Sequence, residues 1–369
     1  YTTRLSKSLH SLQTGIVNKN LSSNGVISKG TFPYGNFDMV DTEGSVPSVG
    51  TDKFKEWTEK AIKFGYLRRL DSVEEIPDFE KGVSVFGSEE KAGFSDTYRK
   101  QCGRCHVWGE GRGKRGDLRA SGCAACHMLY GNDGKYEGDD PHIKNTGERP
   151  HPLRHRITTA IPAAQCTHCH TRGKRIGTTF VGMFEFDYIK DAHAAPFDEK
   201  GEAQKPLFTK EYMHVRKDVH FERGMQCVDC HTSIDVHGDG NIYPATLYQV
   251  EISCYDCHGT PEKFPWELSV GHGTPVTLDG ARGTYKKNSV EYLLTSRGNV
   301  KENWRREGDT SYVYSRFTGK KHKIPLLKEI DETDTYKTKQ GKVAMSTIHK
   351  HMEKMECYAC HATWAPQCF

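Results

Sequence analysis

The pattern of apolar and polar residues predicts one clear helix in the first hundred residues. Between residues 52 and 70, Phe54, Trp57, Ile62 and Phe64 recur at the spacing of an amphipathic helix. The fifty residues before it are rich in Ser, Gly, Asn and Thr, which predicts an extended arm with little core of its own. We therefore expect residues 1–100 to form an N-terminal arm followed by a helix.

β-type composition appears in residues 259–350. The stretches 290–294 and 311–317 are rich in β-branched and aromatic residues, and Gly and Asn lie in the gaps between them. This pattern predicts a small antiparallel β insertion around residues 270–330. The segment before it, residues 101–258, favours short helices, turns and coil.

One five-residue motif, C-x-x-C-H, recurs six times and is the attachment signature of c-type haem. Its two thiols add across the two vinyl groups of a haem, and the adjacent histidine ligates the iron. The predicted haem-bearing cysteines are Cys102, Cys105, Cys123, Cys126, Cys166, Cys169, Cys227, Cys230, Cys254, Cys257, Cys357 and Cys360. The predicted proximal histidines are His106, His127, His170, His231, His258 and His361.

Two other uses of these cysteines fit the pattern less well. A zinc site would pair two C-x-x-C knuckles in one tetrahedron and would not need a histidine after every second cysteine. A disulfide framework would not repeat one spacing six times. The repeat therefore predicts six covalent haem c groups.

The motif spacing predicts the domain organisation. Five motifs lie in residues 101–258, which leaves little room for large helices or sheets. We expect mostly coil with short α-helices wrapped around stacked covalent haems. Residues 259–350 are the haem-free β-rich insertion, and residues 351–369 carry the sixth motif. Cys368 is the one cysteine outside the six motifs, and it would begin a seventh motif if the chain continued; the alternative is a free or intermolecular thiol.

The chain has 19 histidines, of which thirteen lie outside the motifs. Such a surplus indicates bis-histidine ligation, which suits electron transfer. His155, His220, His237 and His351 lie so near a motif in sequence that each is expected to ligate a neighbouring haem rather than its own. The further candidates are His151, His168, His214, His272 and His349, and then His142, His193 and His322.

His10 is a separate candidate ligand, because it lies about ninety residues before the first motif. On an extended arm it could fold back onto a haem of its own chain or reach a haem of the next molecule. The second arrangement would be an open, head-to-tail contact, which generates filaments.

Composition limits the partners and the compartment. The formal net charge is +4, but the two propionates on each of six haems would move it by about −12, so basic content is no argument for nucleic acid. Thioether attachment needs thiols available outside the reducing cytoplasm, so we expect an extracytoplasmic protein, at the cell surface, extracellular or periplasmic. No apolar run approaches the length of a membrane span, and no signal peptide is visible, so we take the chain as a processed form.

Four stretches resemble the large extracytoplasmic multihaem cytochromes of metal-reducing and other anaerobic microbes. They are H-R-I-T-T-A-I-P-A-A-Q-C at residues 155–166, D-V-H-F-E-R-G-M-Q-C-V-D-C-H at 218–231, D-V-H-G-D-G at 235–240 and H-M-E-K-M-E-C-Y-A-C-H-A-T-W-A-P-Q-C at 351–368. The resemblance implies electron transfer through bis-histidine haems. It also implies that His155, His220, His237 and His351 match distal ligands.

Some proteins of this kind polymerise into conductive filaments, and distantly similar octahaem proteins of the tetrathionate-reductase kind are enzymes. We therefore expect a conduit that passes electrons to redox proteins, an extracellular acceptor or further copies of itself, as a homo-oligomer or filament. The alternative is a reductase of a small nitrogen or sulfur oxyanion at one five-coordinate haem. The catalytic relatives often carry C-x-x-C-K at the active haem, and this sequence has none, so an enzyme is the less favoured class.

Overall fold

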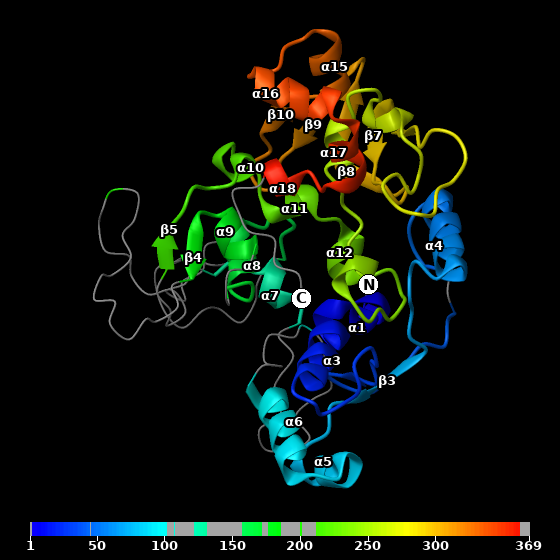
Figure 1. Cartoon of the computed structure of the whole chain (residues 1–369), viewed down its shortest axis with the longest axis vertical. Coiled ribbons are helices and arrows are strands. Elements are labelled where there is room, and N and C mark those ends of the chain that lie inside the picture. Colours follow the sequence, from blue (N-terminus) through cyan, green and yellow to red (C-terminus); the bar gives the residue numbers. More distant parts are fainter. Residues whose placement is uncertain are drawn as a thin grey trace.

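A computed structural model of the chain describes residues 2–44, 46–101, 107, 122–130, 157–171, 176–185, 200 and 212–361 (Figure 1). The first motif (residues 102–106), His142, His151, His155, His193 and Cys368 lie outside the described residues. The other five motifs lie within them.

The N-terminal segment is helical and buried, so the prediction of an extended arm is wrong. It forms α1 (Thr2–Lys7), α2 (Leu9–Leu12) and α3 (Thr14–Ser23). Leu12, Val17 and Leu21 are fully buried. The polar residues of the segment also find partners inside the molecule: Thr14 Oγ1 donates to the Tyr243 carbonyl, and Asn18 Nδ2 donates to the Tyr34 carbonyl over 2.6 Å. At these positions the polar side chains therefore serve buried hydrogen bonds within the protein.

Helix α4 (Asp52–Phe64) begins at Thr51, whose side chain accepts from Phe54 N, and ends at Gly65 in the left-handed conformation (φ 83°). It is shorter than the predicted 52–70. Trp57 is fully buried and its Nε1 donates to the Val276 carbonyl over 2.9 Å, whereas Phe64 is exposed. The helix therefore packs on the segment that follows the fifth motif.

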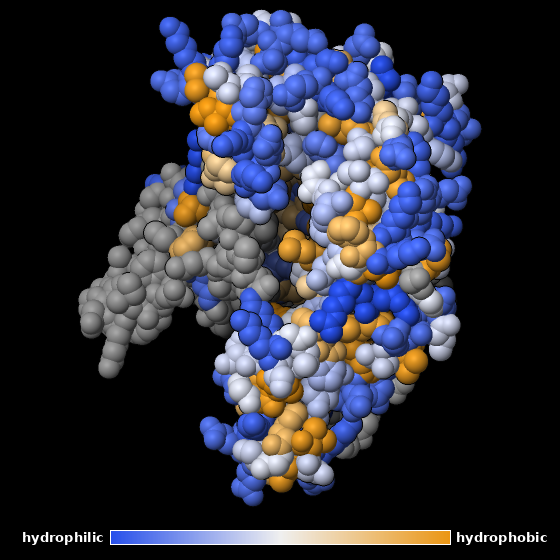
Figure 2. Space-filling view, turned by 45° about the vertical axis from the view of Figure 1, so that its right-hand side comes forward, coloured by the Kyte–Doolittle hydropathy of each residue, from blue (hydrophilic) through white to orange (hydrophobic). Residues whose placement is uncertain are grey.

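A small sheet and a helical hairpin complete the first hundred residues. The sheet contains β1 (Tyr34–Gly35), β3 (Ser72–Glu75) and β2 (Met39–Val40), in that order. The hairpin contains α5 (Phe79–Phe86) and α6 (Glu89–Gln101) and lies at the lower end of the molecule in Figure 1. Apolar residues are exposed at this end (Figure 2), among them Phe79 and Val85 of α5.

The largest sheet is a five-stranded antiparallel meander in the order β10-β9-β8-β7-β6. Its strands are β6 (Thr284–Lys287), β7 (Val290–Leu294), β8 (Val300–Glu307), β9 (Thr310–Tyr314) and β10 (Lys321–Lys323). The two stretches of β-type composition correspond to β7 and β9. Leu293, Trp304 and Val313 form a buried cluster with Met225 and Trp266, and Cys230 and Cys257 pack against it. The sheet therefore supports the segments that carry the fourth and fifth motifs.

Short helices and one further strand pair make up the rest of the described chain. They are α7 (Ala124–His127), α8 (Ala163–Thr167), α9 (Ile176–Phe180), β4 (Met183–Glu185), β5 (Tyr212–His214), α10 (Val219–Glu222), α11 (Cys227–Cys230), α12 (Ser233–His237), α13 (Thr246–Gln249), α14 (Tyr255–His258), η2 (Pro265–Glu267), α15 (Leu327–Glu332), α16 (Lys339–Lys342), η3 (Val343–Thr347), α17 (His349–Lys354) and α18 (Tyr358–His361). Among the described helices, none has the length and apolar character needed to cross a membrane.

Leu12 tests whether the N-terminal helices are part of the core. Its side chain is 0% exposed, so Leu12→Ala removes buried apolar contacts and should lower the free energy of unfolding by about 2–5 kcal/mol. Leu247 is 82% exposed and is the matched control. Leu247→Ala should change the free energy of unfolding by less than about 0.5 kcal/mol. Urea unfolding of the haem-loaded protein measures both; equal effects would contradict a docked N-terminal segment.

Candidate haem-binding sites

We number the C-x-x-C-H motifs 1 to 6 in chain order; motifs 2 to 6 are described. Each of these five is bent into a single turn, in which the histidine amide donates to the carbonyl of the first cysteine. The N···O distances are 3.0 Å in motif 2, 3.0 Å in motif 3, 2.9 Å in motif 4, 3.1 Å in motif 5 and 3.0 Å in motif 6. Residues three apart in such a turn lie on one face, so both thiols of a motif point to the same side. None of the ten cysteines of the described motifs forms a disulfide.

Motifs 2, 3 and 4 follow one another in space as they do in sequence. Gln165 Nε2 donates to the carbonyls of Ala125 (2.6 Å) and Met128 (3.0 Å), which joins motif 3 to motif 2. Ala163 N donates to Gln226 Oε1 over 2.7 Å, which joins the approach to motif 3 to motif 4. A hydrogen bond to the Cys227 thiol raises the pKa of Cys166, so the first cysteines of motifs 3 and 4 are in contact.

Motifs 5 and 6 are also in contact. Their first cysteines, Cys254 and Cys357, share a hydrogen bond that raises the pKa of Cys254 and lowers that of Cys357 to about 7. Tyr255, inside motif 5, donates its hydroxyl to the Met352 carbonyl over 3.1 Å. Cys230 of motif 4 and Cys257 of motif 5 pack on the same buried cluster of the large sheet. Motifs 2 to 6 therefore form a continuous series, and cofactors bound to them would be neighbours.

Three motif histidines each face a second histidine from a distant segment. The ring centroids of His127 and His237 are 6.0 Å apart, with the rings nearly parallel at 7°. His170 and His10 are 6.1 Å apart, and His258 and His220 are 6.2 Å apart, with interplanar angles of 68° and 51°.

These separations fit an iron atom between the two rings. A metal–imidazole bond is about 2 Å long, and a ring nitrogen lies about 1.1 Å from the ring centre, so two imidazoles on opposite sides of one iron have centroids about 6.2 Å apart. The same separations also fall within the range of about 4.5–7 Å for ordinary aromatic pairs, so the case for iron rests on the donor set as well as on the distance. The donor set also suits haem iron, for which histidine is a common axial ligand.

Three of the paired histidines have Nδ1 within hydrogen-bond distance of a backbone carbonyl. His127 Nδ1 lies 2.7 Å from the Thr158 carbonyl and His258 Nδ1 lies 2.7 Å from the Pro325 carbonyl. His237 Nδ1 lies 3.2 Å from the Ser233 carbonyl. A carbonyl oxygen only accepts, so each Nδ1 carries the proton and each Nε2 is left with its lone pair. Metal-ligating histidines are held in this way in proteins.

Carboxylates take the place of carbonyls at two histidines around motif 4. His220 Nδ1 lies 2.8 Å from Asp218 Oδ1, and the same carboxylate caps α10 by accepting from the His220 amide. His231 Nδ1, in motif 4 itself, lies 2.9 Å from Asp235 Oδ2. A carboxylate that accepts from Nδ1–H increases the basicity of the imidazole as a ligand.

Burial favours the neutral form of these imidazoles. It lowers the pKa of His10 and of His258, and it lowers the pKa of His237 to about 4, with smaller effects from Arg4 and His127. A neutral imidazole is the form that binds a metal. These three candidates are therefore ready to ligate at neutral pH without losing a proton first.

His10 folds back onto its own chain. His10 belongs to α2 and lies opposite His170 of motif 3. Its Nδ1 is buried. Burial lowers the pKa of His10, and the nearby Val236 carbonyl raises it by a smaller amount. Of the two arrangements predicted for His10, the single chain therefore takes the first, in which His10 lies opposite a motif histidine of its own chain.

The remaining predicted ligands have different settings. His351 Nδ1 lies 3.1 Å from the Ala344 carbonyl, and His272 packs edge-on against the Tyr255 ring with centroids 4.8 Å apart. His214 lies in β5, opposite Met183 of β4. Among the described residues, His231 and His361 are not paired with a second histidine ring as the other three motif histidines are. His151 and His155, predicted as distal ligands, lie outside the described residues.

Two motif aspartates were not singled out from the sequence. Asp229 in C-V-D-C-H and Asp256 in C-Y-D-C-H occupy the same motif position, and both are fully buried. Asp229 Oδ1 accepts from Arg316 N over 2.6 Å, and Asp256 Oδ1 accepts from Arg282 Nη1 over 2.6 Å. Each therefore fixes its motif to the region of the large sheet. The repeated C-x-D-C-H pattern is the feature of the sequence that could have indicated these two aspartates.

Lys301 and Trp304 of β8 bind the backbone of motif 4 through their side chains. Lys301 Nζ donates to the carbonyls of His231 (2.6 Å) and Val228 (3.0 Å), and Trp304 Nε1 donates to the Asp229 carbonyl over 2.8 Å. Burial lowers the pKa of Lys301 to about 8. The backbone of motif 4 is thus fixed by buried donors from the sheet, which limits the movement of His231.

Residues 165–259 match the family model described as Cytochrome c554 and c-prime. The matched segment is about a quarter of the 369-residue chain and contains motifs 3, 4 and 5. It supports a c-type cytochrome that carries covalently bound haem c and passes electrons to redox partners. No curated protein and no solved structure matched the chain.

Removal of the thiols of one motif should remove one covalent haem. The double variant Cys254→Ala/Cys257→Ala cannot form the thioethers of motif 5, so its intact mass should fall by one haem beyond the change in the side chains. Cys368→Ala in the 369-residue chain is the control and should leave the haem count unchanged. Mass spectrometry under denaturing conditions measures both; an unchanged count in the double variant would contradict attachment at motif 5.

Proposed function

We propose that the protein is a multihaem conduit in which electrons move along a row of covalent haems with histidine on both sides of the iron. The three histidine pairs are the observation that carries this proposal, since their separations of 6.0, 6.1 and 6.2 Å suit one iron each. In the proposed assignment, His237 ligates the haem of motif 2, His10 that of motif 3 and His220 that of motif 5.

The series of contacts between motifs supports a continuous path. Motif 2 contacts motif 3, motif 3 contacts motif 4, and motif 5 contacts motif 6. When bound, the haem irons supply the reversible one-electron chemistry. The residues of this chain fix the spacing between them, since the cysteines tether the cofactor and the buried aspartates hold the motifs to the sheet.

Two histidines on one iron also favour electron transfer over catalysis. Held by two histidines, the iron would keep its ligands in both oxidation states and would offer no site to a substrate. The three paired motif histidines are therefore proposed to belong to haems that only transfer electrons. A reductase function would need an open iron at another motif.

We further propose an extracytoplasmic location, because covalent haem attachment needs thiols that are kept available outside the reducing cytoplasm. The proposed partners are redox proteins or an extracellular electron acceptor. His10 is committed to its own chain in this assignment. A filament with a continuous haem row would therefore have to be bridged by another ligand or by direct contact of haems.

His237→Ala tests the proposed ligand of motif 2. Without this imidazole, the iron opposite His127 should lose its sixth ligand. The variant should then show one high-spin haem in electron paramagnetic resonance and should bind one equivalent of carbon monoxide in the reduced state.

Ser233→Ala is the matched control. It removes the hydroxyl 3.1 Å from His237 Nδ1 but keeps the Ser233 carbonyl and the imidazole. It should leave the haem low-spin and unable to bind carbon monoxide. If His237→Ala is as low-spin as the control, His237 is not a ligand and the pairing is refuted.

A further inference from the structure

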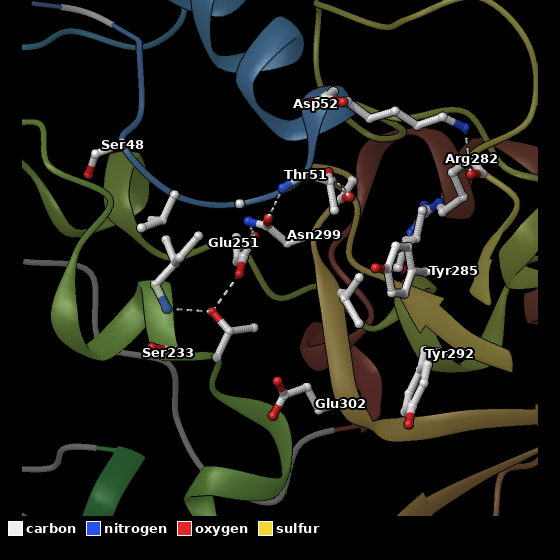
Figure 3. Close-up of a pocket in the computed structure, with 18 of the residues that line it drawn as sticks. Ser48, Thr51, Asp52, Ser233, Glu251, Arg282, Tyr285, Tyr292, Asn299 and Glu302 are labelled. Atoms are coloured by element: carbon white, nitrogen blue, oxygen red, sulfur yellow. Dashed lines mark hydrogen bonds between the residues drawn. The ribbon is translucent and has the colours of Figure 1, made fainter. Parts of the chain in front are cut away.

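A solvent-connected pocket lies beside motif 4, on the side where α12 begins. Its volume is about 1340 Å³, and Ser48, Thr51, Ser233, Asn299 and Glu302 are among its lining residues (Figure 3). Glu251 also lines this pocket, and Figure 3 shows its side chain directed toward Asn299. Among the carboxylates that line the pocket, Glu251 is buried and accepts its hydrogen bonds from neutral side chains.

Glu251 is buried, with 2% of its surface exposed, and is held by neutral donors. Thr232 Oγ1 donates to Oε1, while Asn299 Nδ2 and Thr295 Oγ1 donate to Oε2 over 2.8 and 3.1 Å. A buried carboxylate is usually paired with a cation, because burial disfavours its charge. Three neutral donors compensate the charge only in part.

Glu251 is connected to the proximal histidine of motif 4 through one residue. The Glu251 amide donates to Asp235 Oδ1 over 2.8 Å, and Asp235 Oδ2 lies 2.9 Å from His231 Nδ1. Thr232, which donates to the Glu251 carboxylate, follows His231 directly in the chain. A change of charge at an iron bound to His231 would therefore act on Glu251 over a short, poorly solvated path.

Burial, with Asp235 second, raises the pKa of Glu251 to about 7, against smaller lowering effects of Thr232, Asn299 and Arg297. Asp235 belongs to α12 and Arg297 to the turn between β7 and β8. The other charged groups around the pocket are Arg4 of α1, Glu43, Asp52 and Lys53 of α4, Arg282, Lys287 of β6 and Glu302 of β8. A carboxyl group with a pKa near neutrality changes its protonation when the local potential changes by a small amount.

We propose that Glu251 is a proton-binding site coupled to electron transfer at motif 4. This inference rests on the proposed function, in which His231 ligates a haem iron. Glu251 takes up one proton from water in the pocket when a redox partner delivers one electron to that iron, and it releases the proton when the electron leaves. One O–H bond forms at the carboxylate and one electron is gained at the iron, so the net charge of the region is unchanged.

The direction follows from electrostatics. The oxidised iron carries one more positive charge and favours the ionised form of Glu251, whereas the added electron favours the protonated form. Reduction therefore becomes harder as the pH rises between the two pKa values of Glu251. A tenfold fall in proton concentration should then lower the potential of one haem by up to about 59 mV.

The test compares redox titrations of the haem-loaded protein at several pH values around neutrality. The unmodified protein should contain one haem whose potential falls as the pH rises. Glu251→Gln keeps a hydrogen-bonding side chain but cannot ionise, and should lose this slope. Glu302→Gln is the matched control, because Glu302 lines the same pocket with an exposed side chain (78%), and it should keep the slope.

A second readout does not depend on the variant folding. Reduction of the unmodified protein in unbuffered solution near pH 7 should take up as much as one proton at this site, and the infrared difference spectrum should gain a protonated-carboxyl band. If no proton is taken up, or if Glu251→Gln retains the slope, the inference is wrong. The proposed function fails separately, if low-spin haem is missing from the unmodified protein.

Discussion

Pairs of imidazole rings about 6 Å apart connect segments that are distant in the sequence, and the proposed haem row depends on them. The N-terminal helices reach motif 3 through His10, and the two flanks of motif 4 reach motif 5 through His220 and motif 2 through His237. Each pair would be closed by one iron. In this account each cofactor would link two distant segments of the chain by binding a histidine from each.

Among the described motifs, motif 4 is connected to several distant parts of the chain. Its two flanks supply two of the proposed distal histidines. The motif's own histidine is held by Asp235, its backbone by Lys301 and Trp304, and its internal aspartate by Arg316. These contacts come from α12 and from the large sheet, which lies outside the haem-bearing segments. The β insertion therefore supports the proposed haem site of motif 4, since it fixes the backbone of this motif from one side.

The candidate attachment cysteines can be named from the sequence because covalent haem attachment requires a fixed local spacing, and the family match covers three of the six motifs. Helix α4 and strands β7 and β9 also lie where the spacing and type of the apolar residues predicted them. The N-terminal helices were missed because Thr14 and Asn18 satisfy their polar groups inside the protein, a contact that no local pattern encodes. Because His220 lies close to motif 4 in the sequence, we predicted that it would ligate the haem of another motif. The sequence does not say which motif, because that depends on tertiary packing. The buried Glu251 carried no sequence signal of its own.

The most direct test is a crystal structure of the haem-loaded protein with anomalous scattering measured at the iron edge. The account predicts one iron between His10 and His170, one between His127 and His237 and one between His220 and His258, each about 2 Å from two Nε2 atoms. An iron bound to His127, His170 or His258 with water, or with any other residue, on its opposite side would contradict the account.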